Sequence, residues 1–233
     1  MNLDCYVSKV APLTTMSLGV GLATGLYGIS FGALSSAAGL DIWQTQVLSL
    51  LMFSGGSQFA FIGVIAAGGP AAVGAAVISA WLLGVRNGFY AVRLNPVLRV
   101  FGLKRVAAAQ LTIDESTAVA TAQSEPKQQS KGFWLTGTAV FVFWNAMTLA
   151  GALLGNAIGD PKTWGLDAAA AAAFLGLLWP RLKERQALAV GALAFLIASL
   201  TTPMLPAGLP VILAGLSAVL IGSFNLFQKK MRA

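Results

Sequence analysis

The polar groups with the clearest chemical potential lie inside an apolar segment, in the stretch Phe53-Ser-Gly-Gly-Ser-Gln-Phe59. Two adjacent glycines weaken a helix there, because each costs about 1 kcal/mol relative to alanine. Backbone groups freed within a membrane must be satisfied by the protein or by a ligand. The stretch therefore predicts a binding site on a broken helix, and the alternative is close helix packing at small residues. The candidate binding residues are Ser54, Gly55, Gly56, Ser57 and Gln58.

A broken helix near the bilayer midplane suits a ligand that carries both charges. The N-terminal end of a half-helix attracts a carboxylate, and carbonyl groups freed at the break accept hydrogen bonds from an ammonium group. Ser30, on the preceding apolar segment, could face the same cavity. Around Ser30, glycines at spacings of four and three share one helix face, which favours helix packing there: Gly21, Gly25, Gly28 and Gly32.

Three charged residues are candidates for carrying or balancing a proton. Asp114 and Glu115 interrupt the Ala- and Val-rich helical pattern of residues 103–123. A carboxylate that faces a low-dielectric path can take up and release a proton, whereas on an amphipathic surface helix the two acids would simply be solvated. Arg86 could pair with either acid or with a substrate carboxylate, and the alternative is that it extends to the inner interface.

The composition identifies the class of protein to which these residues belong. Of the 233 residues, 57% are hydrophobic and 10% are charged, whereas soluble domains carry about 25% charged residues. Several apolar runs reach the roughly 20 residues that a helix needs to cross the hydrocarbon core. We therefore expect an all-α polytopic membrane protein.

The same composition argues against several kinds of chemistry. The chain has no histidine and a single cysteine, Cys5, so we expect no metal site, no internal disulfide and no cofactor. There is no phosphate-binding loop for ATP hydrolysis. The net charge of +7 comes largely from short loops and the C-terminus, as expected for cytoplasmic loops, so we expect no nucleic-acid partner.

The apolar runs predict about seven spanning helices, over residues 13–38, 44–67, 70–94, 133–158, 164–180, 185–203 and 208–228. Basic residues gather before the fourth helix, at 181–185 and at 229–232, which predicts that these places are cytoplasmic. The segment 100–131 is then also cytoplasmic and the N-terminus external, with only Lys9 against the rule. An eighth crossing through 103–123 is the alternative, although it places four basic residues outside.

An internal repeat accompanies this topology. Residues 32–53 resemble residues 151–174, with Trp43 aligned to Trp164 and Phe53 to Phe174. Weak internal repeats are typical of secondary transporters. We predict an inverted three-helix repeat plus one extra helix: a first repeat over 1–99, a cytoplasmic amphipathic linker over 100–131, and a second repeat with the C-terminal helix over 132–233.

Four motifs resemble the large subunit of AzlC-type branched-chain amino acid exporters: residues 30–40, residues 53–59, Leu111-Thr-Ile-Asp-Glu-Ser116 and Gly165-Leu-Asp-Ala168. The likeness extends from about residue 13 to 222. It implies export of leucine, isoleucine, valine or related amino acids, together with a small AzlD-type membrane subunit. One motif differs, because the family typically has Asn-Leu-Arg-His where this chain has Gly84-Val-Arg-Asn87.

Together these observations predict a secondary transporter that exports branched-chain or related apolar amino acids across the bacterial inner membrane, driven by the proton motive force. In this prediction the two repeats rock about a site near residues 54–58 and expose it to each side in turn. The alternative is a membrane subunit that forms a site only with a small partner. An enzyme is not expected, because the intramembrane residues supply no nucleophile–base pair.

Overall fold

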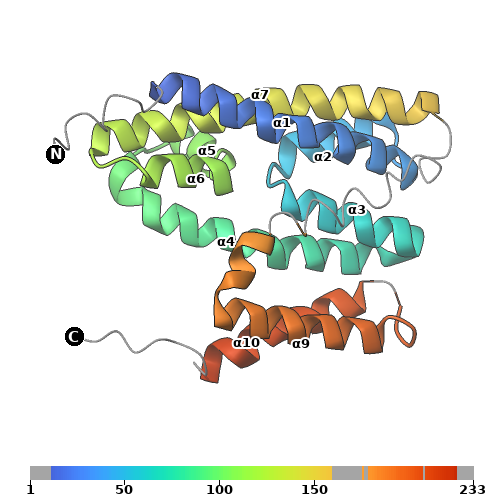
Figure 1. The fold of residues 1–233 in the computed structure, drawn as a ribbon. Coiled ribbons are helices and arrows are strands. Elements are labelled where there is room, and N and C mark those ends of the chain that lie inside the picture. Colours follow the sequence, from blue (N-terminus) through green and yellow to red (C-terminus); the bar gives the residue numbers. More distant parts are fainter. Residues whose placement is uncertain (1–11, 159–174, 176–177, 207, 225–233) are drawn as a thin grey trace, which may run out of the picture.

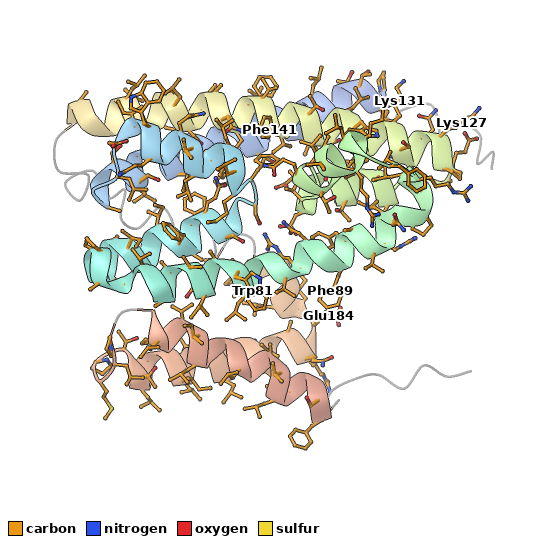
Figure 2. All side chains as sticks on the ribbon, turned by 180° about the vertical axis from the view of Figure 1, so that it is seen from behind. Trp81, Phe89, Lys127, Lys131, Phe141 and Glu184 are labelled. Carbon is orange, nitrogen blue, oxygen red and sulfur yellow. The ribbon has the colours of Figure 1, made fainter. Side chains whose placement is uncertain are left out.

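The computed structural model describes residues 12–158, 175, 178–206 and 208–224. These residues form helices and connecting turns without a β-strand (Figure 1), which confirms the all-α class. Three helical segments are long and apolar enough to cross a membrane: Leu13–Ala37, Gly56–Leu98 and Pro126–Gly155. Large apolar side chains on the outer surface are exposed, among them Trp81 at 68% and Phe89 at 71% (Figure 2), as expected of a surface that faces lipid.

Three long helices form the frame of the molecule: α1 (Leu13–Ala37), α4 (Val73–Leu98) and α7 (Pro126–Ile158). At 1.5 Å per residue they are about 37 to 50 Å long, which exceeds the ~30 Å hydrocarbon core. The remaining helices are α2 (Ile42–Leu51), α3 (Gly56–Gly68), α5 (Leu103–Gln110), α6 (Asp114–Thr121), α9 (Arg185–Thr201) and α10 (Leu209–Phe224), with 3₁₀ turns η3 (Gly69–Ala72) and η5 (Trp179–Lys183).

Helices α2 and α3 form a hairpin that enters the bundle and turns back, here called hairpin 1 (residues 42–68). They are only about 15 and 20 Å long, so neither can cross the hydrocarbon core. Ala38 and Leu40, just before α2, pack against the buried cluster that contains Val64 and Ile65 near the end of α3. The single crossing predicted over 44–67 is thus corrected: the break at Gly55 is present, but the second half-helix returns.

Helices α5 and α6 form a second hairpin, here called hairpin 2 (residues 103–121). Leu111 at its turn faces Gly137 of α7, whereas Val119 near its end faces Gly132, so α6 runs antiparallel to α7 and back toward the start of that helix. The expected surface helix is corrected for α6 only. Leu103 and Val106 of α5 are 88% and 67% exposed, whereas the apolar side chains in and just before α6 are buried between α4 and α7: Ile113, Val119 and Ala120.

The two hairpins enter from opposite ends of the bundle, and their turns meet near its middle (Figure 1). The order helix, hairpin, helix, hairpin therefore gives an inverted repeat of α1–α2–α3 with α4–α5–α6. This unit is one long helix plus one hairpin rather than three crossings. The predicted second copy over 132–233 includes residues 159–174, which lie outside the described residues.

Helices α1 and α7 run parallel, and this changes the expected position of the N-terminus. Leu13 at the start of α1 lies beside Gly132 near the start of α7, and Gly32 lies beside Ala152 farther along both helices. The start of α1 and the end of the 100–131 segment are therefore at the same end of the bundle. The prediction of opposite sides is wrong because hairpin 1 returns where a crossing was expected.

Small residues allow α1 and α7 to approach closely. A Cβ added to Gly32 would collide with the carbonyl oxygen of Thr148 and lie 2.6 Å from the Ala152 nitrogen. The hydroxyl of Thr136 donates to Ser17 Oγ at 2.9 Å across the same seam. The α1 face of Gly21, Gly25, Gly28 and Gly32 was predicted to pack against another helix, and it packs against α7. This close packing fixes α1 and α7 as the frame on which the hairpins are held.

The last two helices form a separate layer. Helices α9 and α10 pack mainly on each other and lie beside α4 (Figure 1). Gly208, just before α10, faces Ala75 of α4 and Val64 of α3. The predicted helix over 164–180 lies almost wholly outside the described residues, while α9 and α10 correspond to the predicted helices 185–203 and 208–228.

Replacing Gly32 with alanine should destabilise the protein, because the added methyl group meets the backbone of α7. Overpacking of this kind costs about 1–3 kcal/mol. The matched control is Gly19→Ala, also on α1, where nothing lies within 4 Å of the added Cβ. Thermal unfolding in detergent, followed by size-exclusion chromatography, should show a lower midpoint for Gly32→Ala only. Equal midpoints for the two variants would contradict the close seam.

Single-cysteine labelling should distinguish this hairpin topology from the seven-crossing topology that the sequence predicted. In a Cys5→Ser background, Thr14→Cys and Gln128→Cys should react with an impermeant thiol reagent from the cytoplasmic side, and Ala71→Cys from outside. All three replaced residues are exposed. Labelling of positions 14 and 128 from opposite sides would mean that hairpin 1 crosses the membrane.

Candidate functional site

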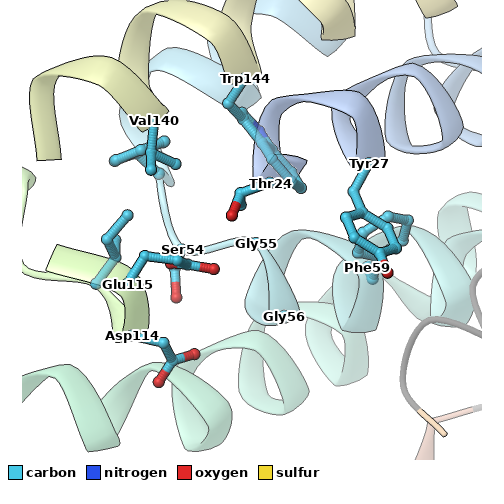
Figure 3. A pocket seen from close by; sticks show the side chains of 12 residues that line it. Thr24, Tyr27, Ser54, Gly55, Gly56, Phe59, Asp114, Glu115, Val140 and Trp144 are labelled. Atoms are coloured by element: carbon cyan, nitrogen blue, oxygen red, sulfur yellow. The ribbon is translucent and has the colours of Figure 1, made fainter. Parts of the chain in front are cut away.

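A cavity of about 150 Å³ lies where the two hairpin turns meet (Figure 3). An engineered cavity of about this volume holds a benzene molecule, so the space is of the right order for a small ligand. Helices α1, α3, α6 and α7 and the two hairpin turns contribute to its wall. The lining residues are Thr24, Tyr27, Phe53, Ser54, Gly55, Gly56, Phe59, Ile113, Asp114, Glu115, Val140 and Trp144.

The turn of hairpin 1 presents the start of helix α3 to the cavity. Gly55 has a φ of +49°, a conformation that glycine adopts without steric cost. Its N–H donates to Gln58 Oε1 at 3.0 Å, which holds the turn in place. The N–H groups of the first helical turn have no intrahelical acceptor, and neither glycine carries a side chain that would cover them. This end of the cavity is therefore electropositive.

The turn of hairpin 2 has the same construction with opposite charge. The N–H of Ile113 donates to Ser116 Oγ at 3.1 Å, just as the N–H of Gly55 donates to the side chain three residues later. Asp114 and Glu115 then form the first turn of α6. Carboxylates are stabilised at a helix N-terminus, so this end of the cavity is electronegative.

Arg86 of α4 joins the two turns. Its Nη2 lies 2.8 Å from Asp114 Oδ2 and donates to the Ser54 carbonyl oxygen at 3.4 Å. Two α4 neighbours support the same contacts. The Tyr90 hydroxyl donates to Asp114 Oδ1 at 2.6 Å, and Asn87 Nδ2 donates to Ser54 Oγ at 3.2 Å. Both turns are thus held against one face of α4.

The two acids differ in their surroundings. Asp114 has both carboxylate oxygens engaged by α4. Glu115 is directed toward the cavity beside Thr24 (Figure 3) and lines its wall. Asp114 is therefore bound to the frame, whereas Glu115 faces the space that a ligand would occupy.

Aromatic residues form the apolar wall of the cavity. Trp144 stacks on Phe31 with ring centroids 6.1 Å apart, and Phe59 meets Trp144 edge-on at 6.2 Å. Phe53 packs against Phe141 at 5.0 Å. Trp144 is only 3% exposed, and its indole N–H has no hydrogen-bond partner in the described structure. The wall is thus largely apolar, and the indole N–H of Trp144 is a buried donor behind its surface.

Comparison with protein families matches residues 19–158 to the family described as AzlC protein. The match covers more than half of the chain. The chain belongs to the AzlC family. This is a transporter family, generally associated with branched-chain amino acid transport. No curated protein and no solved structure matches the chain.

The segment shared with the AzlC family contains both hairpins and every residue that lines the cavity. Five of the predicted site residues are among these lining residues: Ser54, Gly55, Gly56, Asp114 and Glu115. The cavity wall therefore combines two stretches that are about 60 residues apart in the sequence, as the opposed hairpins require.

The other predicted site residues lie outside the cavity wall as the structure describes it. Ser57 is buried, with its Oγ 3.1 Å from Ser54 Oγ. Gln58 is fully buried and holds the turn of hairpin 1, so it supports the site from behind. Arg86 likewise lies behind the wall and holds the two turns in place through its contacts with Asp114 and the Ser54 carbonyl oxygen. Ser30 is half-buried on α1 and is not among the lining residues.

Sequence reasoning did not identify the α1 and α7 residues of the wall, which include Thr24, Tyr27, Val140 and Trp144. Trp144 carried a usable signal. Tryptophans of membrane proteins concentrate at the interfaces, yet Trp144 falls in the middle of the predicted helix 133–158. The others are common residue types in apolar helices and gave no signal.

Asp114→Asn should loosen hairpin 2, because Arg86 loses its counter-charge. The pair is about one-third exposed, so solvent weakens it and we expect a loss on the order of 1 kcal/mol rather than the several of a buried pair. Hydrogen exchange at residues 111–121 should accelerate. Glu125→Gln, which removes an exposed acid just after hairpin 2, is the matched control. Unchanged protection in Asp114→Asn would show that Arg86 does not hold the turn.

Proposed function

We propose that this AzlC-family chain is a secondary transporter that exports branched-chain or related apolar amino acids across the bacterial inner membrane. The supporting observation is the cavity between the hairpin turns. It is small, it has an electropositive and an electronegative end, and aromatic side chains form the wall between them. A zwitterion with a short apolar side chain matches these three properties.

Transport then follows from changes at the hairpin turns. Each hairpin enters the bundle from one end (Figure 1), and in our proposal it closes the cavity toward that end. Movement of hairpin 1 away from α4 opens one path, and movement of hairpin 2 opens the other. Such alternate opening around a midplane site is how inverted-repeat transporters work. In our proposal the proton motive force drives the cycle, with Asp114, Glu115 and Arg86 as the coupling residues.

A small AzlD-type membrane subunit belongs to the proposal as a partner. An apolar groove between α2 and α3 gives it one possible surface, since these half-helices separate after their shared turn. The groove also favours the second candidate function, a membrane subunit that transports nothing without its partner. The groove residues include Val47, Leu51, Phe61 and Ile65.

Gly56→Leu should abolish leucine export while the protein stays in the membrane. A Cβ at Gly56 would lie 3.1 Å from Arg86 Nη2 and 3.2 Å from Leu83 Cδ2, so a leucine side chain there would displace Arg86 and the start of α3 that lines the cavity. Gly63→Leu is the control on the same helix, since nothing lies within 4 Å of its added Cβ. Export of radiolabelled leucine from loaded cells measures the effect.

The same assay, with and without a co-expressed small subunit, distinguishes the two candidate functions. Export by this chain alone would support the transporter, and export only with the partner would support the second candidate. If cells that express the wild-type protein export no apolar amino acid in either case, the proposed function is contradicted. If Gly56→Leu exports leucine as well as wild type does, the proposed site is contradicted.

Coupling is tested in proteoliposomes that contain the wild-type protein. Leucine movement against its gradient should require an imposed pH difference and should stop when a protonophore collapses it. Exchange of labelled for unlabelled leucine should continue without the pH difference. Uphill transport that is insensitive to the protonophore would exclude the proton as the coupling ion.

A further inference from the structure

The two hairpin turns have the same backbone construction but opposite chemistry. In each, the N–H of the residue before the half-helix donates to a side chain three positions later: Gly55 to Gln58, and Ile113 to Ser116. The next residues are Gly56 and Ser57 in hairpin 1. The equivalent positions in hairpin 2 hold Asp114 and Glu115. One helix start is therefore open and positive, while the other carries two carboxylates.

Only one of these carboxylates is available to a ligand. Asp114 is bound to Arg86 and Tyr90 of α4. Glu115 faces the cavity beside Thr24 and is not part of the contacts with α4 (Figure 3). A cation that entered the cavity would therefore meet Glu115 as its counter-charge, because a carboxylate accepts several hydrogen bonds and Glu115 has acceptor capacity left.

The opposite wall suits a carboxylate. The first turn of α3 directs its N–H groups toward the cavity at Gly56. The guanidinium group of Arg86 lies directly behind, 3.1 Å from where a Cβ on Gly56 would be. Trp144 lies beside this turn, with its Cη2 3.8 Å from where a Cβ on Gly55 would be, so its ring borders the carboxylate position on the apolar side.

We propose that Glu115 binds the ammonium group of the substrate while the start of α3 at Gly56 binds its carboxylate. The zwitterion then bridges the two hairpin turns, and its apolar side chain lies against Phe53, Val140 and Trp144. The inference rests on the proposed function and specifies its ligand as a free α-amino acid. An amine or a carboxylic acid of the same shape satisfies only one of the two ends.

Bound substrate and a bound proton exclude each other at Glu115, because a protonated carboxyl group loses its charge attraction for an ammonium group. The other titratable or charged groups near Glu115 are Asp114 on α6, Arg86 and Tyr90 on α4, and Tyr27 on α1. Helix α7 and hairpin 1 contribute no titratable side chain to the cavity wall. Substrate binding should therefore weaken as pH falls.

Binding of three probes to the purified protein tests the inference: L-leucine, 4-methylpentanoate, which lacks the amino group, and 3-methylbutylamine, which lacks the carboxylate. Wild type should bind leucine more tightly than either analogue. Glu115→Gln should weaken leucine binding about 10- to 100-fold, as expected when a hydrogen bond between charged groups is lost. It should also bind leucine and 4-methylpentanoate equally, and its affinity should no longer depend on pH.

Two further variants make the result specific. Glu125→Gln removes an exposed acid outside the cavity and should behave as wild type. Glu115→Asp keeps the charge on a shorter side chain, so it should bind leucine weakly yet still prefer it to 4-methylpentanoate. This second variant also provides the test if Glu115→Gln does not fold.

The outcomes separate this inference from the proposed function. Leucine binding by wild type together with an unchanged affinity and preference in Glu115→Gln would overturn the role of Glu115 and leave the proposed function standing. No leucine binding by the folded wild-type protein would overturn both.

Discussion

The contact on which the site depends is the one that Arg86 makes with both hairpin turns. A hairpin that ends inside a membrane leaves backbone groups at its turn that lipid cannot satisfy. Arg86 supplies donors to the Ser54 carbonyl oxygen and the Asp114 carboxylate from one guanidinium group. The ion pair offsets the cost of placing either charge in a low-dielectric region. Without it, only the Asn87–Ser54 and Tyr90–Asp114 hydrogen bonds would connect the two turns to α4, and the cavity wall would be less firmly held.

The parallel seam of α1 and α7 provides the fixed part against which the hairpins can move. Glycines bring the two backbones into contact at Gly32 and Gly151, so this pair cannot open without breaking many contacts at once. The hairpin turns share a buried apolar cluster with α1 and α7, through Phe53 and Ile113, but hydrogen bonds and one ion pair connect them to α4. Such contacts can exchange between partners, which is what alternate opening requires. A rigid seam between α1 and α7, together with two hairpin turns whose contacts can exchange, would let one cavity open to each side of the membrane in turn.

The sequence predicted the class, the long helices and the break at Gly55, because apolar length and paired glycines act locally. It did not predict that hairpin 1 returns, since a half-helix that returns and one that continues have the same local pattern. The break before Asp114 was also missed, because Leu111-Thr-Ile113 contains neither glycine nor proline. There the Ser116 hydroxyl satisfies the turn, and a serine in an apolar helix is too common to be a signal. The pairing of Arg86 with Asp114 was among the alternatives considered, but its bridging of both turns depends on the tertiary fold.

In the proposed mechanism, the cavity between the two hairpin turns opens to each side of the membrane and holds the substrate. Cysteine accessibility at Val140 measures this directly, because Val140 lines the cavity and is 1% exposed, whereas Val142, two residues along α7, is 57% exposed on the outer surface. In a Cys5→Ser background, Val140→Cys should react with a small water-soluble thiol reagent from either side, and leucine should protect it. Val142→Cys should face lipid and should not react with the reagent from either side of the membrane. A Val140→Cys that is unreactive, or that reacts equally with and without leucine, would contradict the account.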